Sequence, residues 1–179
     1  NDLSFDALQE IINTLGPRVS SQNPSCIYQA CENKKVTLKI VKLLHSTLHG
    51  AFRSDDGAEY LPIHYLCVNK YLDDTASIDI LRFMLDIDPT LSREVNGDDW
   101  LPIHHAAQCK STAFCKELID AYPESLRIES RSYGWPIHLV CRFGNRVDTT
   151  DTIQYMLELD PELINAEDSD GYLPIHWAA

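Results

Sequence analysis

A four-residue string recurs along this chain and constrains its fold more than any other feature. The string is Leu-Pro-Ile-His, with Trp in place of Leu in one copy, and the copies begin at Leu61, Leu101, Trp135 and Leu173. The intervals between these first residues are 40, 34 and 38 residues. Recurrence at such a period is the signature of a repeat architecture, whose units cannot bury their apolar faces alone. We therefore expect neighbouring units to stack and to share one continuous core.

Each copy of the string predicts the start of a short helix. Proline suits the first helical position because its missing N–H would have no intrahelical partner there. In the first complete copy we expect this helix to run through Tyr65 to Asn69. Turn-forming residues such as Gly, Asn and Asp precede each copy, as in segment 96–100, and predict a tight turn before the helix.

A second helix is predicted in each unit from apolar residues spaced three and four apart. Asp-Pro or Tyr-Pro follows three of these helices and ends them, because the residue before proline avoids the α region. The predicted second helices span about residues 36–48, 77–85, 112–121 and 152–159. An amphipathic segment also opens the chain, and its predicted helical face carries Leu8, Ile11, Ile12 and Leu15.

These patterns predict a single domain, 1–179, made of successive units. The opening segment 1–24 is interpreted as an N-terminal capping helix. Segment 25–60 is a degenerate repeat, in which Ile27 is kept while Pro and His are lost. The predicted regular repeats are 61–100, 101–134 and 135–172, and 173–179 is the start of a further, truncated repeat.

The charge of the chain restricts its partners. The net charge is −12, from 15 Lys and Arg against 27 Asp and Glu. Contacts with phosphate groups need Lys and Arg, so nucleic acid and anionic membrane surfaces are disfavoured as partners. No stretch approaches the roughly 18 apolar residues of a membrane helix, so membrane insertion is not expected. The expected partner is another protein with a basic or neutral surface.

Six cysteines are present, and their placement argues against disulfides. Cys31, Cys67 and Cys141 occupy one repeat position. Equivalent positions on stacked helices lie about 8–10 Å apart, whereas a disulfide needs Cα atoms within about 7 Å. We therefore expect small, buried, reduced cysteines and an intracellular, reducing compartment, in the first place the cytoplasm.

The segment 168–179 resembles the hallmark of the ankyrin repeat family, Asp-x-x-Gly-x-Thr-Pro-Leu-His-x-Ala-Ala, with only Thr and Leu exchanged. Segment 96–107 is nearly as similar, with Asp99 in place of the Gly. The resemblance covers about residues 25–179. It implies an all-α fold, an α-solenoid of stacked helix–turn–helix repeats with short hairpin or turn fingers.

The chain also departs from the family pattern. Leu or Trp replaces the Thr that normally caps the first helix, and the glycine usual after the second helix is missing. The spacings exceed the usual period of about 33 residues, so we expect the insertions in the loops. Loss of the capping hydroxyl costs about 1 kcal/mol per helix unless the turn backbone or the histidine replaces it.

The recurring histidines, His64, His104, His138 and His176, are the obvious catalytic or metal-binding candidates. The resemblance implies instead that each bonds backbone groups of its own turn and of the next unit. Equivalent histidines would lie about 10 Å apart, too far to share a zinc ion with ligand bonds of about 2 Å. No catalytic residue, metal ligand or cofactor is therefore expected. Metal binding or cysteine catalysis by a loose cluster of His105, Cys109 and Cys115 is the minor alternative.

Partner binding is the main functional hypothesis. The resemblance implies contacts through the turn tips and the exposed face of the first helices. The residue before each motif is Tyr60, Trp100, Gly134 or Tyr172, and large aromatics are enriched at contact hot spots. The predicted partner-binding residues are Tyr60, Trp100, Tyr172, Asp98, Asp99, Arg131, Asp170, Asn69, Gln108, Arg142 and Phe143.

Two points about these residues stay open at the level of sequence. The aromatic residues can also pack along neighbouring turns, which is compatible with binding. The acidic turns are either a solvated face or an attraction for a basic partner at low salt; their residues are Asp55, Asp56, Glu59, Asp98, Asp99, Asp168 and Asp170.

The sequence thus predicts a non-catalytic protein-interaction module or scaffold with a rigid concave surface. Because both ends of the sequence are abrupt, the alternative is a recognition or scaffolding segment of a larger enzyme or multi-subunit assembly, whose working part lies outside this chain.

Overall fold

The structure is a computed structural model, and it describes residues 25–48, 50–53, 57, 59–143 and 148–178. The predicted capping helix 1–24 lies outside the described residues, as do Asp55 and Asp56 of the acidic turns.

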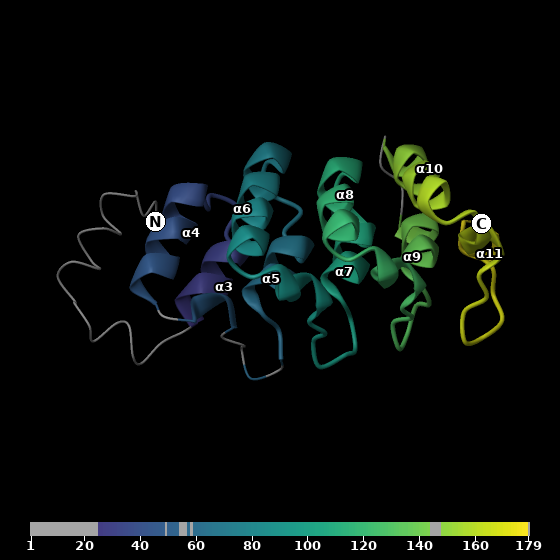
Figure 1. Cartoon of the computed structure of the whole chain (residues 1–179), viewed down its shortest axis with the longest axis horizontal. Coiled ribbons are helices and arrows are strands. Elements are labelled where there is room, and N and C mark those ends of the chain that lie inside the picture. Colours follow the sequence, from purple (N-terminus) through teal and green to yellow (C-terminus); the bar gives the residue numbers. More distant parts are fainter. Residues whose placement is uncertain (1–24, 49, 54–56, 58, 144–147, 179) are drawn as a thin grey trace.

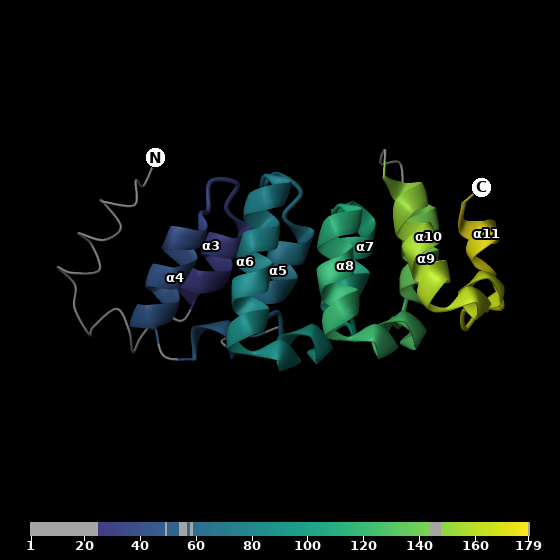
Figure 2. The ribbon, with the colours of Figure 1, turned by 45° about the horizontal axis from the view of Figure 1, so that its top comes forward.

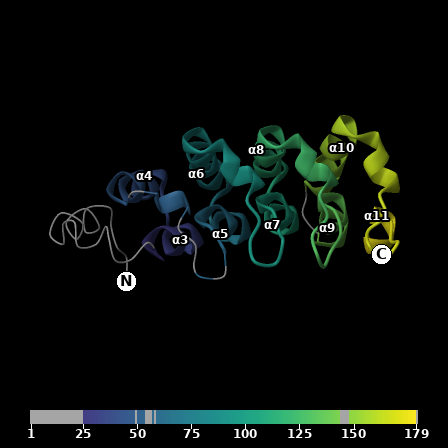
Figure 3. The ribbon, with the colours of Figure 1, turned by 60° about the horizontal axis from the view of Figure 1, so that its bottom comes forward.

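The described chain folds into pairs of antiparallel helices that stack side by side in sequence order (Figure 1). The first helices form one layer and the second helices another, which Figure 3 shows most clearly. The first helices are α3 (Ser25–Glu32), α5 (Pro62–Val68), α7 (Pro102–Cys109), α9 (Pro136–Phe143) and α11 (Pro174–Trp177). The second helices are α4 (Leu38–Thr47), α6 (Asp74–Ile87), α8 (Thr112–Ala121) and α10 (Thr149–Leu159). The predicted α-solenoid is therefore confirmed, whereas the exact unit boundaries stay a prediction.

The recurring string starts each first helix as expected. Proline is the first residue of α5, α7, α9 and α11. The isoleucine after it enters the core, with 0–2% of its surface exposed at Ile63, Ile103 and Ile137. Ile27 of the degenerate repeat is equally buried. The string is therefore a structural device that begins a helix and anchors it in the shared core.

The motif histidine links its own helix to the next repeat. In His104, Nδ1 accepts from the Leu101 N–H at 3.0 Å, and Nε2 bonds the Ile128 carbonyl at 2.9 Å. Because Nδ1 is an acceptor, the ring proton lies on Nε2. His64 and His138 repeat this pattern, and all three rings are fully buried. The expected backbone role of these histidines is confirmed: each ring bonds the N–H of the residue that begins its own motif and a carbonyl of the next unit.

Two second helices begin earlier than predicted. Helix α6 starts at Asp74 rather than at residue 77, because the carboxylate of Asp73 caps it by accepting from the Ala76 N–H at 3.1 Å. Helix α10 starts at Thr149 rather than at residue 152. Helix α8 matches its predicted range, and α4 is shorter than 36–48 at both ends.

Each proline after a second helix begins a 3₁₀ helix, where the sequence predicted only a loop. These turns are η2 (Pro89–Arg93), η3 (Pro123–Arg127) and η4 (Pro161–Asn165), and Figure 2 shows them along one edge of the stack. Each turn buries one leucine in the core: Leu91, Leu126 or Leu163. These turns are a constant part of the repeat, because each proline lies 12 residues before the start of the next motif. The residues that lengthen two of the repeats therefore lie before the proline and not in these turns.

All six cysteines are free thiols. Cys31 and Cys67 are fully buried, and Cys141 is half-buried. Burial raises the pKa of Cys31 to about 12 and raises that of Cys67 well above its usual value. The expected role of these thiols as small core residues is confirmed for Cys31 and Cys67.

Candidate protein-binding surface

The turns before α7, α9 and α11 form short fingers on one side of the stack (Figure 1). Each finger is closed by a backbone bond across five residues, from Asn96 to Trp100, Ser130 to Gly134 and Asp168 to Tyr172, at 2.9–3.1 Å. The first side chain of the finger reinforces this bond. Oδ1 of Asn96 accepts from the N–H groups of residues 98 and 100, and Asp168 does the same for residues 170 and 172. The fingers therefore hold their side chains in fixed positions.

The finger before α9 differs at Gly134. This residue has φ +71°, and a Cβ built there would lie 2.8 Å from the Cβ of Asp168 and 3.1 Å from Nδ1 of His138. An aromatic side chain therefore cannot occupy the position that Trp100 and Tyr172 hold in their fingers. Tyr133, one residue earlier, supplies the ring in this finger instead.

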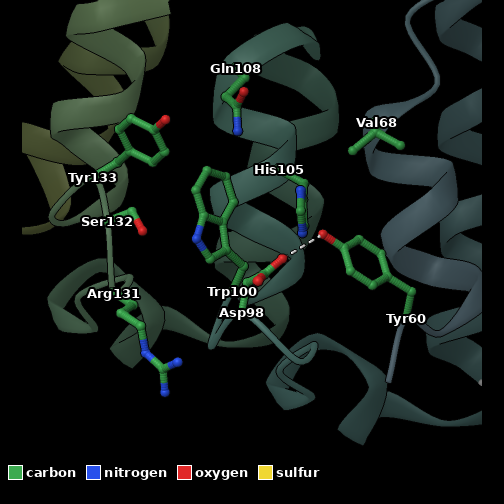
Figure 4. A pocket seen from close by; sticks show the side chains of 9 residues that line it. All are labelled: Tyr60, Val68, Asp98, Trp100, His105, Gln108, Arg131, Ser132 and Tyr133. Atoms are coloured by element: carbon green, nitrogen blue, oxygen red, sulfur yellow. Dashed lines mark hydrogen bonds between the residues drawn. The ribbon is translucent and has the colours of Figure 1, made fainter. Parts of the chain in front are cut away.

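A groove of about 460 Å³ crosses three consecutive units next to the fingers (Figure 4). This size falls within the roughly 300–1,000 Å³ range of small-ligand sites. We call it the Trp100 groove, and its lining residues are Tyr60, Val68, Asp98, Trp100, His105, Gln108, Arg131, Ser132 and Tyr133. It brings together Tyr60, Asp98, Trp100, Gln108 and Arg131 from the predicted set.

Aromatic rings form most of the groove wall. The ring centroid of His105 lies 5.6 Å from that of Tyr60 and 4.9 Å from that of Trp100, so both rings contact this imidazole. On the other side of Trp100, the Tyr133 ring stands edge-on at 5.5 Å. Figure 4 shows His105 between Tyr60 and Trp100, with Val68 and Gln108 farther along the groove. Such rigid, amphipathic rings supply contact area with little loss of conformational freedom.

His105 is uncharged at neutral pH. Its ring is buried, and Nε2 lies 3.1 Å from Nδ2 of Asn96. Because Oδ1 of Asn96 accepts the finger N–H groups, Nδ2 must donate to this imidazole nitrogen. Burial, followed by the nearby imidazoles of His64 and His104, lowers the pKa of His105 to about 3. The groove floor therefore carries no positive charge.

Two carboxylates flank the groove and differ in whether a cation pairs with them. Asp98 is exposed, and its Oδ2 accepts from the Tyr60 hydroxyl at 3.1 Å. Asp99 forms an ion pair with Arg131 at 2.5 Å, and both side chains are more than half exposed. The charge of Asp99 is thus balanced within the chain, whereas that of Asp98 is not balanced by any described cation.

The structure corrects part of the predicted surface. Asn69 is 4% exposed, and its amide donates to the carbonyls of Cys31 at 2.8 Å and Asn33 at 3.3 Å. It therefore holds two repeats together and is not available to a partner. Trp100 is 8% exposed, so most of its ring packs between fingers and only a part faces the groove.

Four other predicted residues lie toward the C-terminal end and do not line the Trp100 groove. Tyr172 is half exposed and Asp170 exposed on the last finger. The Arg142 guanidinium covers the Tyr133 ring at 4.9 Å and the Trp177 ring at 4.6 Å. Phe143 is half-buried beside it and also contacts the Tyr133 ring.

The predicted set lacks Val68, His105, Ser132 and Tyr133 of the groove. Val68 and His105 occupy positions of the first helix at which the repeats carry different residues. Tyr133 was missed because the alignment places Gly134, not Tyr133, at the aromatic position. A glycine where neighbouring fingers carry aromatics is the signal that could have found it.

The minor alternative around His105 gains no support from the geometry. Cys109 directs its thiol to the Cys67 carbonyl at 3.3 Å, and Cys115 is buried. Within the described ranges, no three His, Cys, Asp or Glu side chains are grouped so that they could hold a metal ion. None of the helices in this part of the chain has the length and apolar character needed to cross a membrane.

Comparisons with known proteins agree with this fold. No family model matches the chain. It is 30% identical over 105 residues to "Ankyrin repeat domain-containing protein 53" of Mus musculus, a match that covers 58% of this chain and 20% of the mouse protein. The chain thus spans about a fifth of the length of that relative.

Among solved structures, the chain is similar to a chain of the complex described as a predatory endopeptidase from Bdellovibrio bacteriovorus with an immunity protein. The TM-score is 0.66 at 18% identity, over 84% of this chain and 72% of the other. At this identity the likeness shows the fold alone. The recurring motif, the two helix layers and these similarities make the chain an α-solenoid of ankyrin-like repeats.

Proposed function

We propose that this chain is a non-catalytic protein-interaction module that holds its partner in the Trp100 groove. The observation that carries the proposal is the groove itself, which gathers side chains of three consecutive units beside the finger tips. The similarity to an ankyrin repeat protein supports a protein-interaction role.

The physical character of the groove supports a protein partner. Tyr and Trp are enriched at contact hot spots, and here they are held by packing and by the closed fingers. A surface fixed before binding loses little conformational entropy on association. The exposed aliphatic Val68 adds apolar area, and Gln108 adds polar groups that can bond a partner backbone.

Affinity capture with matched surface variants tests this proposal. Val68→Glu places a charge in the groove at an exposed position, whereas Ile87→Glu places one at the end of α6, outside the lining of the groove. A protein captured from the source cells by the wild type should be lost with Val68→Glu and kept with Ile87→Glu. Equal capture by both variants would remove the groove from consideration as the binding site.

The alternative, that the chain is the recognition segment of a larger enzyme or assembly, stays a prediction. The length and composition of the native gene product test it directly.

A further inference from the structure

In successive units, the same position of the first helix lies beside the aromatic rings of the fingers, and the side chain at this position differs from unit to unit. The helix position after Cys67, Ala107 and Cys141 carries Val68, Gln108 and Arg142 respectively. At the last of these positions the chain supplies its own cation. The Arg142 guanidinium lies over the Tyr133 ring of its finger and the Trp177 ring of the next unit.

The corresponding place two units earlier is the Trp100 groove. There Tyr60 belongs to the finger, and His105 occupies the position that Trp177 holds in the later unit. The helix position between them is Val68, whose short, uncharged side chain leaves the aromatic walls open to the groove. Aromatic faces attract guanidinium groups through the electron density of the ring, and Arg stacks on them better than Lys does.

A carboxylate completes the arrangement. Oδ2 of Asp98 accepts from the Tyr60 hydroxyl, while Oδ1 has no hydrogen-bond partner among the residues the structure describes. The other charged side chain that lines the groove, Arg131, is paired with Asp99, and Figure 4 shows it on the opposite side of Trp100 from Tyr60. His105 is neutral and does not repel a cation. The side of the groove between Tyr60 and Trp100 is therefore aromatic and negatively charged.

We propose that this side of the groove binds an arginine side chain of the partner, with the guanidinium against the Tyr60 and Trp100 rings and hydrogen-bonded to Asp98. The inference rests on the proposed function and names the chemistry that the groove recognises. It assigns to a partner arginine the role that Arg142 has within the chain.

Titration of the labelled protein, followed by two-dimensional NMR, tests the proposal with a minimal probe. The probe is the peptide acetyl-Gly-Arg-Gly-amide, and its matched control replaces Arg by citrulline, which has the same shape without the charge. The arginine peptide should shift the Trp100 indole N–H and the backbone amides of Val68, Asp98 and Gln108. A second control, the lysine peptide acetyl-Gly-Lys-Gly-amide, should shift the same signals more weakly. The citrulline peptide should leave these signals in place.

Three variants locate the site. Asp98→Asn removes the charge, and Val68→Arg introduces a guanidinium at the position of Arg142 that should block the groove. Each should weaken binding of the arginine peptide roughly five-fold or more, the size expected when a cation–aromatic or charge contact is lost. Asp170→Asn makes the same change at the equivalent position of the last finger and should leave binding unchanged.

Several results would overturn the inference: no shifts with the arginine peptide, equal shifts with the citrulline or lysine peptide, or undiminished binding to Asp98→Asn. The proposed function fails separately. If Val68→Glu abolishes capture of the partner while Asp98→Asn binds that partner as well as the wild type does, the groove is the interface but arginine is not its ligand.

Discussion

The buried histidines of α7 should make the protein lose stability in mild acid. His104 is buried, and this burial lowers its pKa to about 4, while that of the neighbouring His105 is lowered to about 3. An unfolded chain has histidine pKa values near 6.5. Below pH 6.5 the unfolded state therefore binds more protons than the folded state, and the free energy of unfolding falls with pH.

The size of the effect follows from these pKa values. A pH of 5 lies about 1.5 units below the pKa of a histidine in the unfolded chain, whereas His104 and His105 stay mostly neutral in the folded state. Each of the two histidines therefore lowers the free energy of unfolding by about 2 kcal/mol at this pH. Together they remove about 4 kcal/mol between pH 7.5 and pH 5, a large part of the roughly 5–15 kcal/mol that holds a typical domain folded. The paired carboxylate of Asp88, with a lowered pKa of about 2, loses its contribution only below about pH 4.

Urea denaturation at several pH values, followed by circular dichroism, measures this loss. His104 and His105 together should account for a loss of about 4 kcal/mol in the wild type. His105→Gln, which keeps a side-chain acceptor for Asn96, should lose about 2 kcal/mol less than the wild type. His176→Gln makes the same change at an exposed motif histidine, and its free energy of unfolding should fall between pH 7.5 and pH 5 as much as that of the wild type. Parallel pH profiles for the wild type and His105→Gln would refute the reasoning.

Three further predictions follow from packing. Gly134→Ala should destabilise the protein by about 3 kcal/mol, because residue 134 has a left-handed backbone and the new Cβ would lie 2.8 Å from the Cβ of Asp168. An unchanged urea midpoint would contradict this. Asn69→Ala should lower the free energy of unfolding by about 2 kcal/mol in urea denaturation, because the carbonyls of Cys31 and Asn33 lose a hydrogen-bond donor. An unchanged free energy of unfolding would contradict the role of Asn69 in joining the two repeats. In a thiol-reagent assay at pH 8, Cys31 and Cys67 should stay unmodified in the native protein and react in urea; rapid native labelling would contradict their burial.

The stacked fold could be predicted because its determinants are local. Proline sets the start of α5, α7, α9 and α11, and the residue before the next proline sets the end of α6, α8 and α10. What the chain does after that proline was not predictable from the same signal. The 3₁₀ turns depend on burying Leu91, Leu126 and Leu163 against neighbouring helices, which is a property of the stack.

The candidate site could be predicted in part for the same reason. Tyr60, Asp98 and Trp100 were predicted because equivalent turn positions point to one side of a repeat stack. Asn69 was misplaced because its burial comes from the preceding unit, whose carbonyls it bonds. Tyr133 was missed because Gly134 stands at the position where neighbouring fingers carry an aromatic residue. The close approach of Asp168 and His138, which excludes a side chain at Gly134, appears only when two units are packed together.

Site-specific cross-linking tests the central claim, that a partner occupies the Trp100 groove. A photoreactive phenylalanine analogue replaces Gln108, which lines the groove, or Gln154, an exposed residue of α10 outside it. With the purified partner, the account predicts covalent adducts from position 108 and none from position 154. Adducts from position 154 alone, or equal adducts from both, would contradict it.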